Sequence, residues 1–560
     1  AWLRRFARER RGAPEPSNPS SARTCDTRRI PVSASTDPTR LSATALSSLL
    51  AAREVSSEEV TRAHLARIEA LDPRLRAFTQ VLHDEALAAA RGLDDERRRG
   101  EIRGPLHGLP ITVKESLDMA GMASTLGVAS RRGHRAAGDA GVTALLRRAG
   151  AVILGRTNVS QLLLYNEARN PLFGQTANPW SLDHSPGGSS GGEAAAIAAG
   201  MSPLGIGTDI GGSIRVPAHC CGIAGMKPTL DRWTNLGSNT ALLGQEAIRS
   251  QVGPMARSAR DLALVMAELD PATMAALDVR VPPFPFTEPA SVEVARLRVG
   301  FYCDDGLVPS STAVARAVVK AASALRARGA TVVPFTPPGI PDAVYGYFAA
   351  LSADGGATAM SLLRGDAADV DVSLRSLRAM ASLPSFARRA AARVAGIAGE
   401  RRLQRLLEVT GPKSVAELWR VTHALREARA AIASAMRAES LDLLLCPPYA
   451  TPALPHTASR DFVLAGSAAM LWNLAQFPAG VVPVTRVRAG EARRERPRDR
   501  LEKRAAEVDA KSEGLPVGVQ VVGLPFSDHV VLAAMITIED ELAGEPDRPV
   551  TPVSPPPLAG

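Results

Sequence analysis

The sequence predicts an α/β protein whose β-sheet is largely covered by helices. Short apolar runs with β-branched residues, typical of buried strands, alternate along the chain with stretches of helical pattern and length. Hydrophobic residues make up 45% of the 560 residues, so the chain can bury a sizeable core.

The helix and strand signals follow one another from residue 41 onward. In the stretch 41–70, Ser56 or Ser57 is expected to cap a helix with two glutamates in its first turn. The next predicted elements are a helix over 83–99, a strand over 108–113, a helix over 139–150 and a strand over 151–155. A helix followed by a buried strand recurs at 311–335 and 426–447, and a strand at 515–523 precedes a helix at 528–542.

Several stretches fall outside this alternation. Residues 1–40 are rich in Arg, Pro and Ser and lack a hydrophobic signal core, so they are predicted to form a disordered basic tail. Residues 486–513 are nearly all polar and are interpreted as a surface excursion between strands. Residues 375–409 mix apolar residues with paired arginines, and 546–560 are interpreted as a loose tail. No linker divides the rest, so 41–545 is predicted to form one domain.

Composition argues against several classes of function. The net charge is +9, the basic residues are scattered and there is no zinc-finger spacing, so nucleic-acid binding is not expected. The five cysteines include no C-x-x-C pair, which favours a reducing compartment. No metal or organic cofactor is expected, because the sequence has no H-E-x-x-H, no phosphate loop and no dinucleotide fingerprint. No membrane-spanning helix is predicted, because no run of about 18 uncharged apolar residues occurs.

Two glycine-framed serine segments carry the main functional signal. Residues 187–192 read GGSSGG and lead into an alanine-rich helix former, and 207–217 read GTDIGGSIRVP. Linkers are usually longer, whereas a glycine-rich loop before a helix presents unpaired N–H groups. Residues 187–191 also fit the G-x-S-x-G nucleophile elbow, which needs an acid and a histidine downstream. None of the candidate histidines lies in a context that marks it as a base: His219, His423, His456 and His529.

A lysine follows the apolar strand over 108–113. Burial disfavours the charged form of Lys114 and lowers its pKa, and a neutral lysine is a competent base at about pH 7 to 9. The alternative is that Lys114 leaves the sheet and pairs with Glu115 or Asp118 in solvent. The residues alone favour neither.

Residues 187–229 resemble the signature of the amidase signature family almost position for position. Lys114 stands 75 residues before Ser189, and Ser213 stands 24 after it, spacings similar to those of the family. The resemblance covers about 41–545 and implies the amidase-signature fold, a central twisted mixed β-sheet covered by helices on both faces. Within the family, the chain most resembles the members that hydrolyse fatty acid amides, in the segments 170–180, 477–487 and 514–526.

The resemblance implies a catalytic triad. Ser213 would be the nucleophile, Lys114 the final base, and Ser189 the residue that passes a proton between them. Ser189 would follow a cis peptide bond from Gly188. The oxyanion hole would be formed by the N–H groups of Ile210, Gly211, Gly212 and Ser213. A serine hydroxyl is a weak nucleophile until a base takes its proton, and paired glycines let successive N–H groups converge on one point.

Further residues are predicted to support or line the site. The supporting residues are Ser190, Thr208, Asp209 and Arg215. Asp209 and Arg215 are interpreted either as orienting groups or as a plain ion pair. Leu163 and Leu164 are predicted to line an acyl channel, with ordinary core leucines as the alternative.

These residues predict a serine amidase that hydrolyses carboxylic amides, fatty acid amides in particular, through an acyl-enzyme. The alternatives are a hydrolase of short-chain or aryl amides or esters, and an amidotransferase subunit of the same family. The expected partner is a small-molecule amide, with a membrane surface and a second copy of the chain as further candidates. Residues 375–409 would form a helical cap facing the membrane, and their arginines favour peripheral contact over deep insertion. The expected location is cytoplasmic or at a membrane surface.

Overall fold

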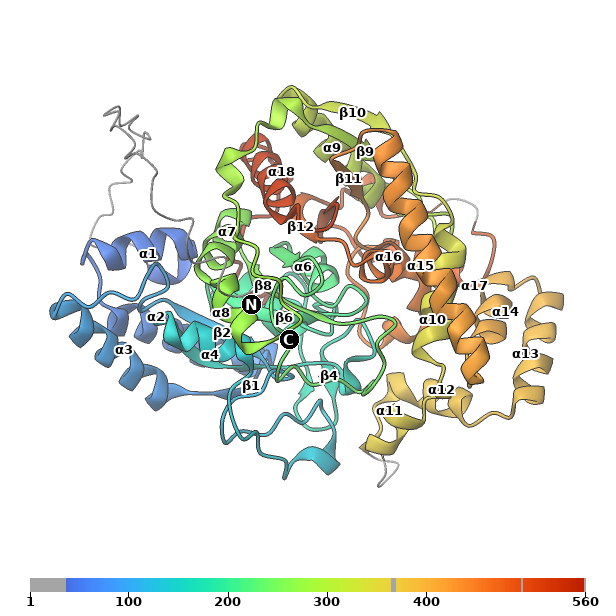
Figure 1. Cartoon of the computed structure of the whole chain (residues 1–560), viewed down its shortest axis with the longest axis horizontal. Coiled ribbons are helices and arrows are strands. Elements are labelled where there is room, and N and C mark those ends of the chain that lie inside the picture. The colour runs from blue at the N-terminus through green and yellow to red at the C-terminus, as the bar shows by residue number, and fades with distance from the viewer. Residues whose placement is uncertain (1–36, 364–368, 495–496, 558–560) are drawn as a thin grey trace, which may run out of the picture. The chain divides into compact units, whose positions relative to one another are not determined.

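The computed structural model describes residues 37–363, 369–494 and 497–557, in which helices and strands alternate (Figure 1). The strands are β1 (Phe78–Val81), β2 (Pro110–Lys114), β3 (Val152–Thr157), β4 (Arg169–Asn170), β5 (Gly174–Gln175), β6 (Leu204–Asp209), β7 (Ala224–Lys227), β8 (Gln251–Ala256), β9 (Arg298–Phe301), β10 (Thr331–Pro334), β11 (Leu443–Cys446), β12 (Ala479–Arg486) and β13 (Pro516–Gly523). The α-helices are α1 (Ala43–Ala51), α2 (Ser57–Leu75), α3 (His83–Arg98), α4 (Gly141–Arg148), α5 (Gly191–Ala198), α6 (Arg215–Cys221), α7 (Ala259–Glu268), α8 (Pro271–Leu277), α9 (Thr312–Ala327), α10 (Ile340–Leu351), α11 (Ala357–Leu362), α12 (Val372–Ala381), α13 (Ser385–Ile397), α14 (Arg401–Val409), α15 (Val415–Ala438), α16 (Ser467–Ala475), α17 (Arg500–Asp509) and α18 (Asp528–Glu541).

Eleven of these strands form one sheet, in the order β1-β3-β2-β6-β8-β7-β12-β13-β11-β9-β10. The sheet is mixed: β2 pairs in parallel with β3 and β6, whereas β12 pairs antiparallel with β7 and β13. Strands β4 and β5 form a separate antiparallel pair. The sheet confirms the predicted α/β class.

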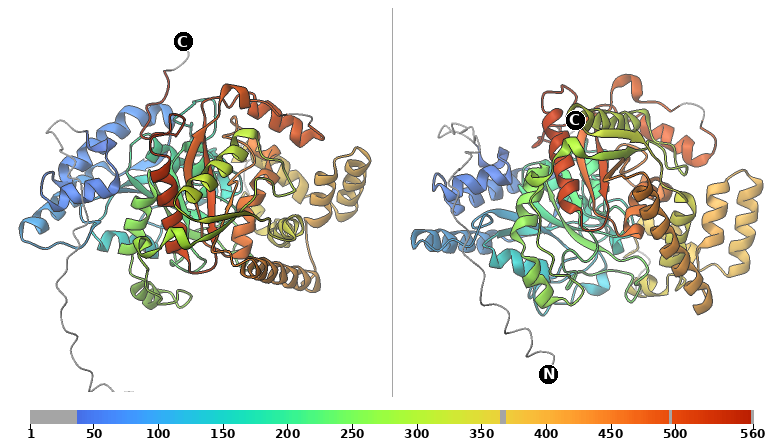
Figure 2. Two further views of the ribbon diagram at one scale, coloured as in Figure 1. Left: turned by 90° about the horizontal axis from the view of Figure 1, so that it is seen from above. Right: turned by 45° about the horizontal axis from the view of Figure 1, so that its top comes forward.

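Helices cover both faces of the sheet (Figure 2). On β12, Val481 packs in one apolar cluster with Ala218 of α6. The next residue, Val482, packs in a different cluster with Val318 of α9 and Leu532 of α18. Because successive strand residues point to opposite faces, α6 lies on one face and α9 and α18 on the other. This double covering explains why the central strands read as continuous apolar runs.

The predicted elements are present, with some ends displaced. Of the two candidate caps, Ser56 begins α2: its Oγ accepts the N–H of Glu59 (3.1 Å), whose carboxylate accepts the N–H of Ser56 (2.8 Å). The stretch 41–70 contains α1 and most of α2. The largest difference is at the start of α15. This helix begins at Val415, before the stretch 426–447 in which the sequence predicts a helix followed by a buried strand.

Parts of the predicted tails fall outside the described residues, namely 1–36 and 558–560. Within the predicted N-terminal tail, Pro38–Arg40 form a 3₁₀ turn, and Arg257 donates a hydrogen bond to the carbonyl of Thr39 (3.2 Å). These four residues, 37–40, belong to the compact unit that contains the sheet.

The prediction of a loose tail over 546–560 is wrong for its described part. Asp547 forms an ion pair with Lys320 of α9 (2.6 Å). The N–H of Val553 donates to the carbonyl of Ala198 at the end of α5 (2.9 Å). The two partners of each contact lie far apart in the sequence, so the composition of the tail could not predict these contacts.

The structure also describes the two segments that stood apart in the sequence, 486–513 and 375–409. Their roles as a surface excursion and a membrane-facing cap stay predictions. The polar stretch 486–513 lies between β12 and β13 and carries α17, which buries Ala505 and Val508 in the core. The stretch 375–409 forms most of α12 together with α13 and α14, on the right of Figure 1.

Candidate active site

Lys114 is the last residue of β2 and is fully buried. Its Nζ donates to Ser189 Oγ (2.8 Å), Thr208 Oγ1 (2.8 Å) and the carbonyl of Thr208 (3.3 Å). In the described part of the chain Lys114 takes part in no ion pair. The alternative in which it pairs with Glu115 or Asp118 in solvent is therefore wrong.

Burial lowers the pKa of Lys114 from 10.5 to about 7. The carboxyl groups of Asp209, Glu193 and Glu115 act in the opposite direction but do not offset the loss of hydration. At neutral pH a substantial fraction of the amine is therefore uncharged and can accept a proton.

The serine loop is part of the core. Residues 184–200 are buried throughout, which excludes the linker interpretation. A cis peptide bond joins Gly188 to Ser189, as the resemblance implied. A Cβ at Gly188 would lie 2.0 Å from the carbonyl oxygen of Glu167, so the loop admits only glycine there. The N–H of Ser190 donates to the carbonyl of Ser213 (3.1 Å), which ties the two serine segments together.

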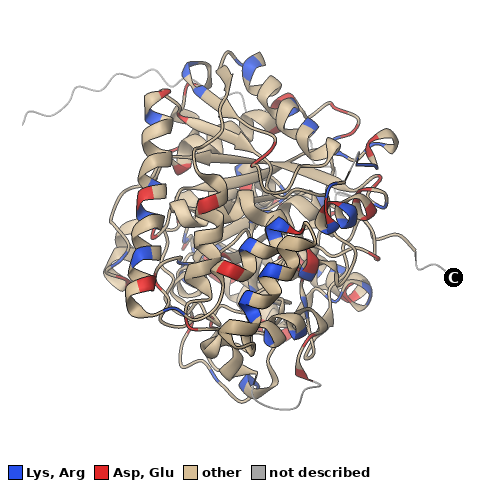
Figure 3. Cartoon of the chain, turned by 90° about the vertical axis from the view of Figure 1, so that its right-hand side faces the viewer, with Lys and Arg blue, Asp and Glu red and all other residues tan. Residues whose placement is uncertain are grey.

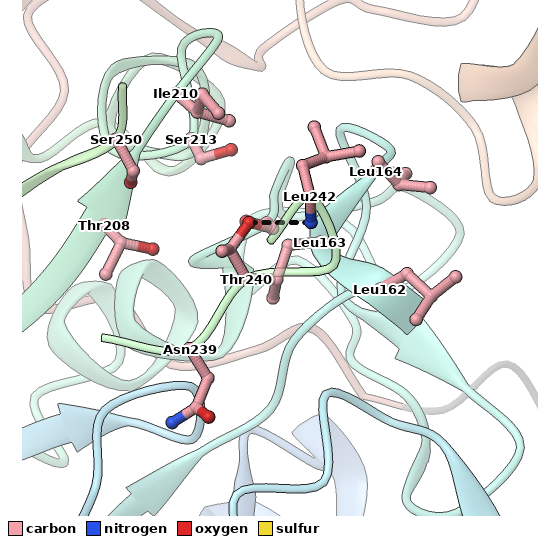
Figure 4. A pocket seen from close by; sticks show the side chains of 11 residues that line it. Leu162, Leu163, Leu164, Thr208, Ile210, Ser213, Asn239, Thr240, Leu242 and Ser250 are labelled. Atoms are coloured by element: carbon pink, nitrogen blue, oxygen red, sulfur yellow. Dashed lines mark hydrogen bonds between the residues drawn. The ribbon is translucent and has the colours of Figure 1, made fainter. Parts of the chain in front are cut away.

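Ser213 lies in the turn between β6 and α6. The turn contains Gly212 at φ +104°, a conformation that favours glycine. Ser213 is 6% exposed, and with Ser189 it lines a pocket with about 340 Å³ of empty space, part of it open to solvent. Figure 4 shows the Ser213 hydroxyl pointing into this pocket.

A buried ion pair shapes the same turn. Asp209 and Arg215 are fully buried and 2.9 Å apart. The carboxylate of Asp209 accepts the N–H groups of Gly212 (2.8 Å) and Ile214 (3.0 Å). Burial alone would raise the pKa of Asp209, but Arg215 outweighs it and holds that pKa well below its usual range. Asp209 and Arg215 thus form the ion pair of one alternative, and Asp209 also binds the backbone on both sides of Ser213, as the other alternative requires.

The predicted oxyanion hole needs one correction. The N–H of Gly212 is engaged by Asp209, so Gly212 does not offer a free donor. In the described residues, no protein acceptor binds the N–H groups of Ile210, Gly211 or Ser213, which leaves these three as the candidate donors.

Two residues that the sequence did not suggest support this turn from other elements. Asn473 of α16 donates to the carbonyl of Asp209 (3.0 Å) and to its carboxylate (2.9 Å). Gln520 of β13 accepts a hydrogen bond from Arg215 (2.5 Å). Of the other predicted supporting residues, Thr208 holds Lys114, and Ser190 Oγ lies 3.4 Å from the carbonyl of Thr208.

The pocket wall contains the two predicted leucines, Leu163 and Leu164. The lining residues that the sequence did not suggest are Leu162, Asn239, Thr240, Leu242 and Ser250. Four of them belong to the loop between β7 and β8, which has no periodicity or motif to mark it. Figure 4 shows the leucines on one side of the pocket and Ser213, Thr208 and Ser250 on the other.

The candidate histidines lie elsewhere. His219 is bonded to the carbonyl of Thr451 (3.0 Å), and His456 to another backbone carbonyl (2.9 Å). In the described residues no histidine contacts Ser189 or Ser213. The geometry therefore does not fit a nucleophile elbow with a histidine base.

A family model described as Amidase matches residues 59–532. The chain belongs to the amidase family. It is therefore an amide-hydrolysing enzyme with the amidase-signature fold.

Among curated relatives, fatty-acid amide hydrolase 1 of Sus scrofa is 39% identical over 455 residues, 79% of this chain and 76% of the relative. A glutamyl-tRNA(Gln) amidotransferase subunit of Acidothermus cellulolyticus is 45% identical over 246 residues, 43% of this chain and 48% of the relative. A solved structure of a fatty acid amide hydrolase has a TM-score of 0.78 at 29% identity and covers 90% of this chain and 85% of that one.

Neither a metal site nor a membrane span is found in the described residues. They contain no group of three or more His, Cys, Asp or Glu side chains that could hold a metal ion. None of their helices has the length and apolar character needed to cross a bilayer.

Proposed function

We propose that the chain is a serine amidase that hydrolyses fatty acid amides through an acyl-enzyme, with Ser213, Ser189 and Lys114 as its triad. One observation carries the proposal. The fully buried amine of Lys114 donates to the hydroxyl of Ser189 (2.8 Å), and Ser189 shares a pocket with Ser213.

The chemistry follows from the proton affinities. Neutral Lys114 accepts the proton of Ser189 as Ser189 accepts that of Ser213. The Ser213 oxygen attacks the amide carbonyl, and the N–H groups of Ile210, Gly211 and Ser213 stabilise the negative oxygen of the tetrahedral intermediate. When the C–N bond breaks, the relay returns the proton to the leaving amine. Water then hydrolyses the acyl-enzyme by the same steps.

The preference for a long acyl chain is proposed from the pocket wall. Leu162, Leu163, Leu164 and Leu242 offer an apolar surface beside the nucleophile. The similarity to fatty-acid amide hydrolases over most of the chain supports the same substrate class.

A variant of Leu163 tests the acyl chain directly. Leu163 has φ 61°, which asparagine adopts readily, so Leu163→Asn changes the polarity of the wall with little backbone cost. We expect the variant to lose roughly tenfold or more in kcat/KM for an oleoyl amide, because a leucine contributes about 1.5–3 kcal/mol when it is covered. Turnover of a propionamide should change little.

Comparing kcat/KM for the oleoyl amide and the propionamide in the wild type separates the fatty acid amide proposal from the alternative substrate classes. A strong preference for the propionamide would refute the fatty acid proposal and favour a short-chain or aryl amidase, which the polar wall residues Asn239, Thr240 and Ser250 would suit. Copurification with two further subunits would favour the amidotransferase alternative. Size-exclusion chromatography of the same preparation tests whether a second copy of the chain is a partner, as the sequence analysis suggested.

Peripheral membrane contact is proposed from exposed apolar side chains on the helical cap, α12 to α14, and the adjoining α15. They include Phe386 (76% exposed), Ile397 (89%) and Trp419 (70%). Figure 3 shows basic and acidic side chains mixed over this side of the molecule. Exposed apolar side chains among arginines suit peripheral contact, with the apolar groups buried at the boundary between lipid headgroups and acyl chains.

Sedimentation with phosphatidylcholine vesicles tests the contact. The double variant Phe386→Ser, Ile397→Ser should lose binding, whereas the control Val279→Ser, at a fully exposed valine outside the cap, should keep it. Equal sedimentation of the two variants would contradict the proposal.

A further inference from the structure

Glu193 is a buried carboxyl group that the mechanism above does not use. It is the third residue of α5, four residues after Ser189, and its side chain is fully buried. In the described part of the chain it forms no ion pair with Lys, Arg or His. Its hydrogen-bond partners are two threonine hydroxyls.

These threonines lie next to Lys114 on two strands. The hydroxyl of Thr112 is hydrogen-bonded to Oε2 of Glu193 (2.6 Å) and that of Thr157 to Oε1 (2.8 Å). Because a hydroxyl can donate or accept, one threonine can take the proton of an uncharged carboxyl group while the other donates to it. Thr112 is two residues before Lys114 on β2 and therefore points to the same face. Thr157 is the register partner of Lys114 on β3. One carboxyl group thus joins both strands to the helix that begins at the serine loop.

The backbone around Glu193 makes room for this arrangement. Gly205 of β6 is the register partner of Thr112. A Cβ at Gly205 would lie 2.0 Å from Oε2 of Glu193. A side chain at 205 would displace the carboxyl group.

We propose that Glu193 is a positioning residue: an uncharged carboxyl group that holds β2 and β3 against α5 and so keeps the amine of Lys114 within reach of Ser189. The inference rests on the proposed function, because it presumes that Lys114 and Ser189 form the proton relay.

The charges around Lys114 explain why the carboxyl group is uncharged. The carboxyl groups whose charges act on the amine are Asp209 of β6, Glu193 of α5 and Glu115, which follows β2. The negative charge of Asp209 is compensated by its ion pair with Arg215. Burial raises the pKa of Glu193 to about 8 and lowers that of Lys114 to about 7, so both groups favour their neutral forms at neutral pH. An ionised Glu193 would stabilise the ammonium form and remove the base.

The test compares variants of the two ends of this contact. Glu193→Gln keeps the shape and can bond to both threonines, so kcat should stay within about threefold of the wild type and the acidic limb of kcat against pH should keep its midpoint. Thr157→Val removes one hydrogen bond at constant shape and should lower kcat by roughly tenfold with KM nearly unchanged, because the amine is displaced. Glu193→Ala, which removes both hydrogen bonds, should lower kcat by more than Thr157→Val does.

The control is Glu539→Gln. Glu539 is also a buried carboxyl group, it binds the N–H of Ala259 (2.8 Å), and burial raises its pKa to about 7, but it lies outside the pocket lining. Its variant should leave kcat and the acidic limb unchanged.

Two results would overturn the inference. A tenfold loss in Glu193→Gln, or a midpoint lowered by about one pH unit, would show that Glu193 acts as an anion. Wild-type kcat in Thr157→Val would show that the contact positions nothing. A wild-type protein that a fluorophosphonate does not label at Ser213 would instead refute the proposed function, which keeps the two failures apart.

Discussion

Replacing Lys114 by methionine separates a buried base from a buried structural lysine. Methionine has similar length and fits an apolar site, but it cannot take a proton from Ser189. General bases contribute about 10²–10⁴-fold, so Lys114→Met should slow fluorophosphonate labelling of Ser213 by that factor at pH 8. The wild type should show the matching pH dependence. With a pKa of about 7, about nine-tenths of the amine is neutral at pH 8 and about one-tenth at pH 6.

The stability of the variant should move in the opposite direction to its activity. The folded-state pKa of Lys114 lies below its unfolded value of 10.5, so the unfolded state binds more protons and wild-type stability rises with pH between about 7 and 10.5. Below pH 7 this difference costs the folded state on the order of 5 kcal/mol, since one pKa unit is worth about 1.4 kcal/mol. Lys114→Met removes that cost and should not lower the midpoint of thermal unfolding at pH 7.

Lys227 provides the matched control. It is the other fully buried lysine whose pKa burial lowers to about 7, but its Nζ donates to backbone carbonyls, including that of Pro228 (3.0 Å). Lys227→Met should keep the acidic limb of the labelling rate. The reasoning fails if Lys114→Met reacts at the wild-type rate at pH 8, or if wild-type labelling is constant between pH 6 and pH 8.

Three further substitutions probe the turn at the nucleophile. Ser213→Ala should abolish the mass increase that a fluorophosphonate produces in intact-protein mass spectrometry; labelling that persists would contradict the assignment. Arg215→Met leaves Asp209 buried without its partner and should lower the free energy of unfolding by about 3–5 kcal/mol; a change below about 1 kcal/mol in urea denaturation would count against this. Gly211→Ala places a Cβ 2.5 Å from the hydroxyl of Tyr347, so kcat should fall, and adding Tyr347→Phe should recover part of the loss; no recovery would mean that the clash is not the cause.

The strands and the two serine segments could be predicted from the sequence because their signals are local. Buried strands read as apolar runs, and the residues around Ser189 and Ser213 form one nearly continuous stretch, 187–229. For Lys114 the sequence limits the environment to two alternatives, because a lysine at the end of an apolar strand is either buried or turned out into solvent. Only the contacts with Ser189 and Thr208 decide between these two.

What the sequence could not show depends on contacts between distant segments. The wall residues Asn239 and Leu242 belong to a loop without periodicity, and they reach the pocket because β7 and β8 bracket that loop. The carboxylate of Asp209 takes the N–H of Gly212, although the glycines alone suggested a free donor. In the sequence nothing distinguishes Glu193 from other glutamates in the first turn of a helix, and only the structure places it beside Thr157.

One strand keeps the neutral base and the buried charges apart. Thr208 and Asp209 are consecutive residues of β6, so their side chains point to opposite faces. Thr208 accepts from Lys114 on one face, and Asp209 binds Arg215 on the other. Asp209 still favours the ammonium form of Lys114, but Arg215 offsets part of its charge, and burial keeps the pKa of Lys114 at about 7 while the carboxylate binds the Ser213 turn. Loss of Arg215 should therefore also raise the pKa of Lys114 and move the acidic limb of activity to higher pH.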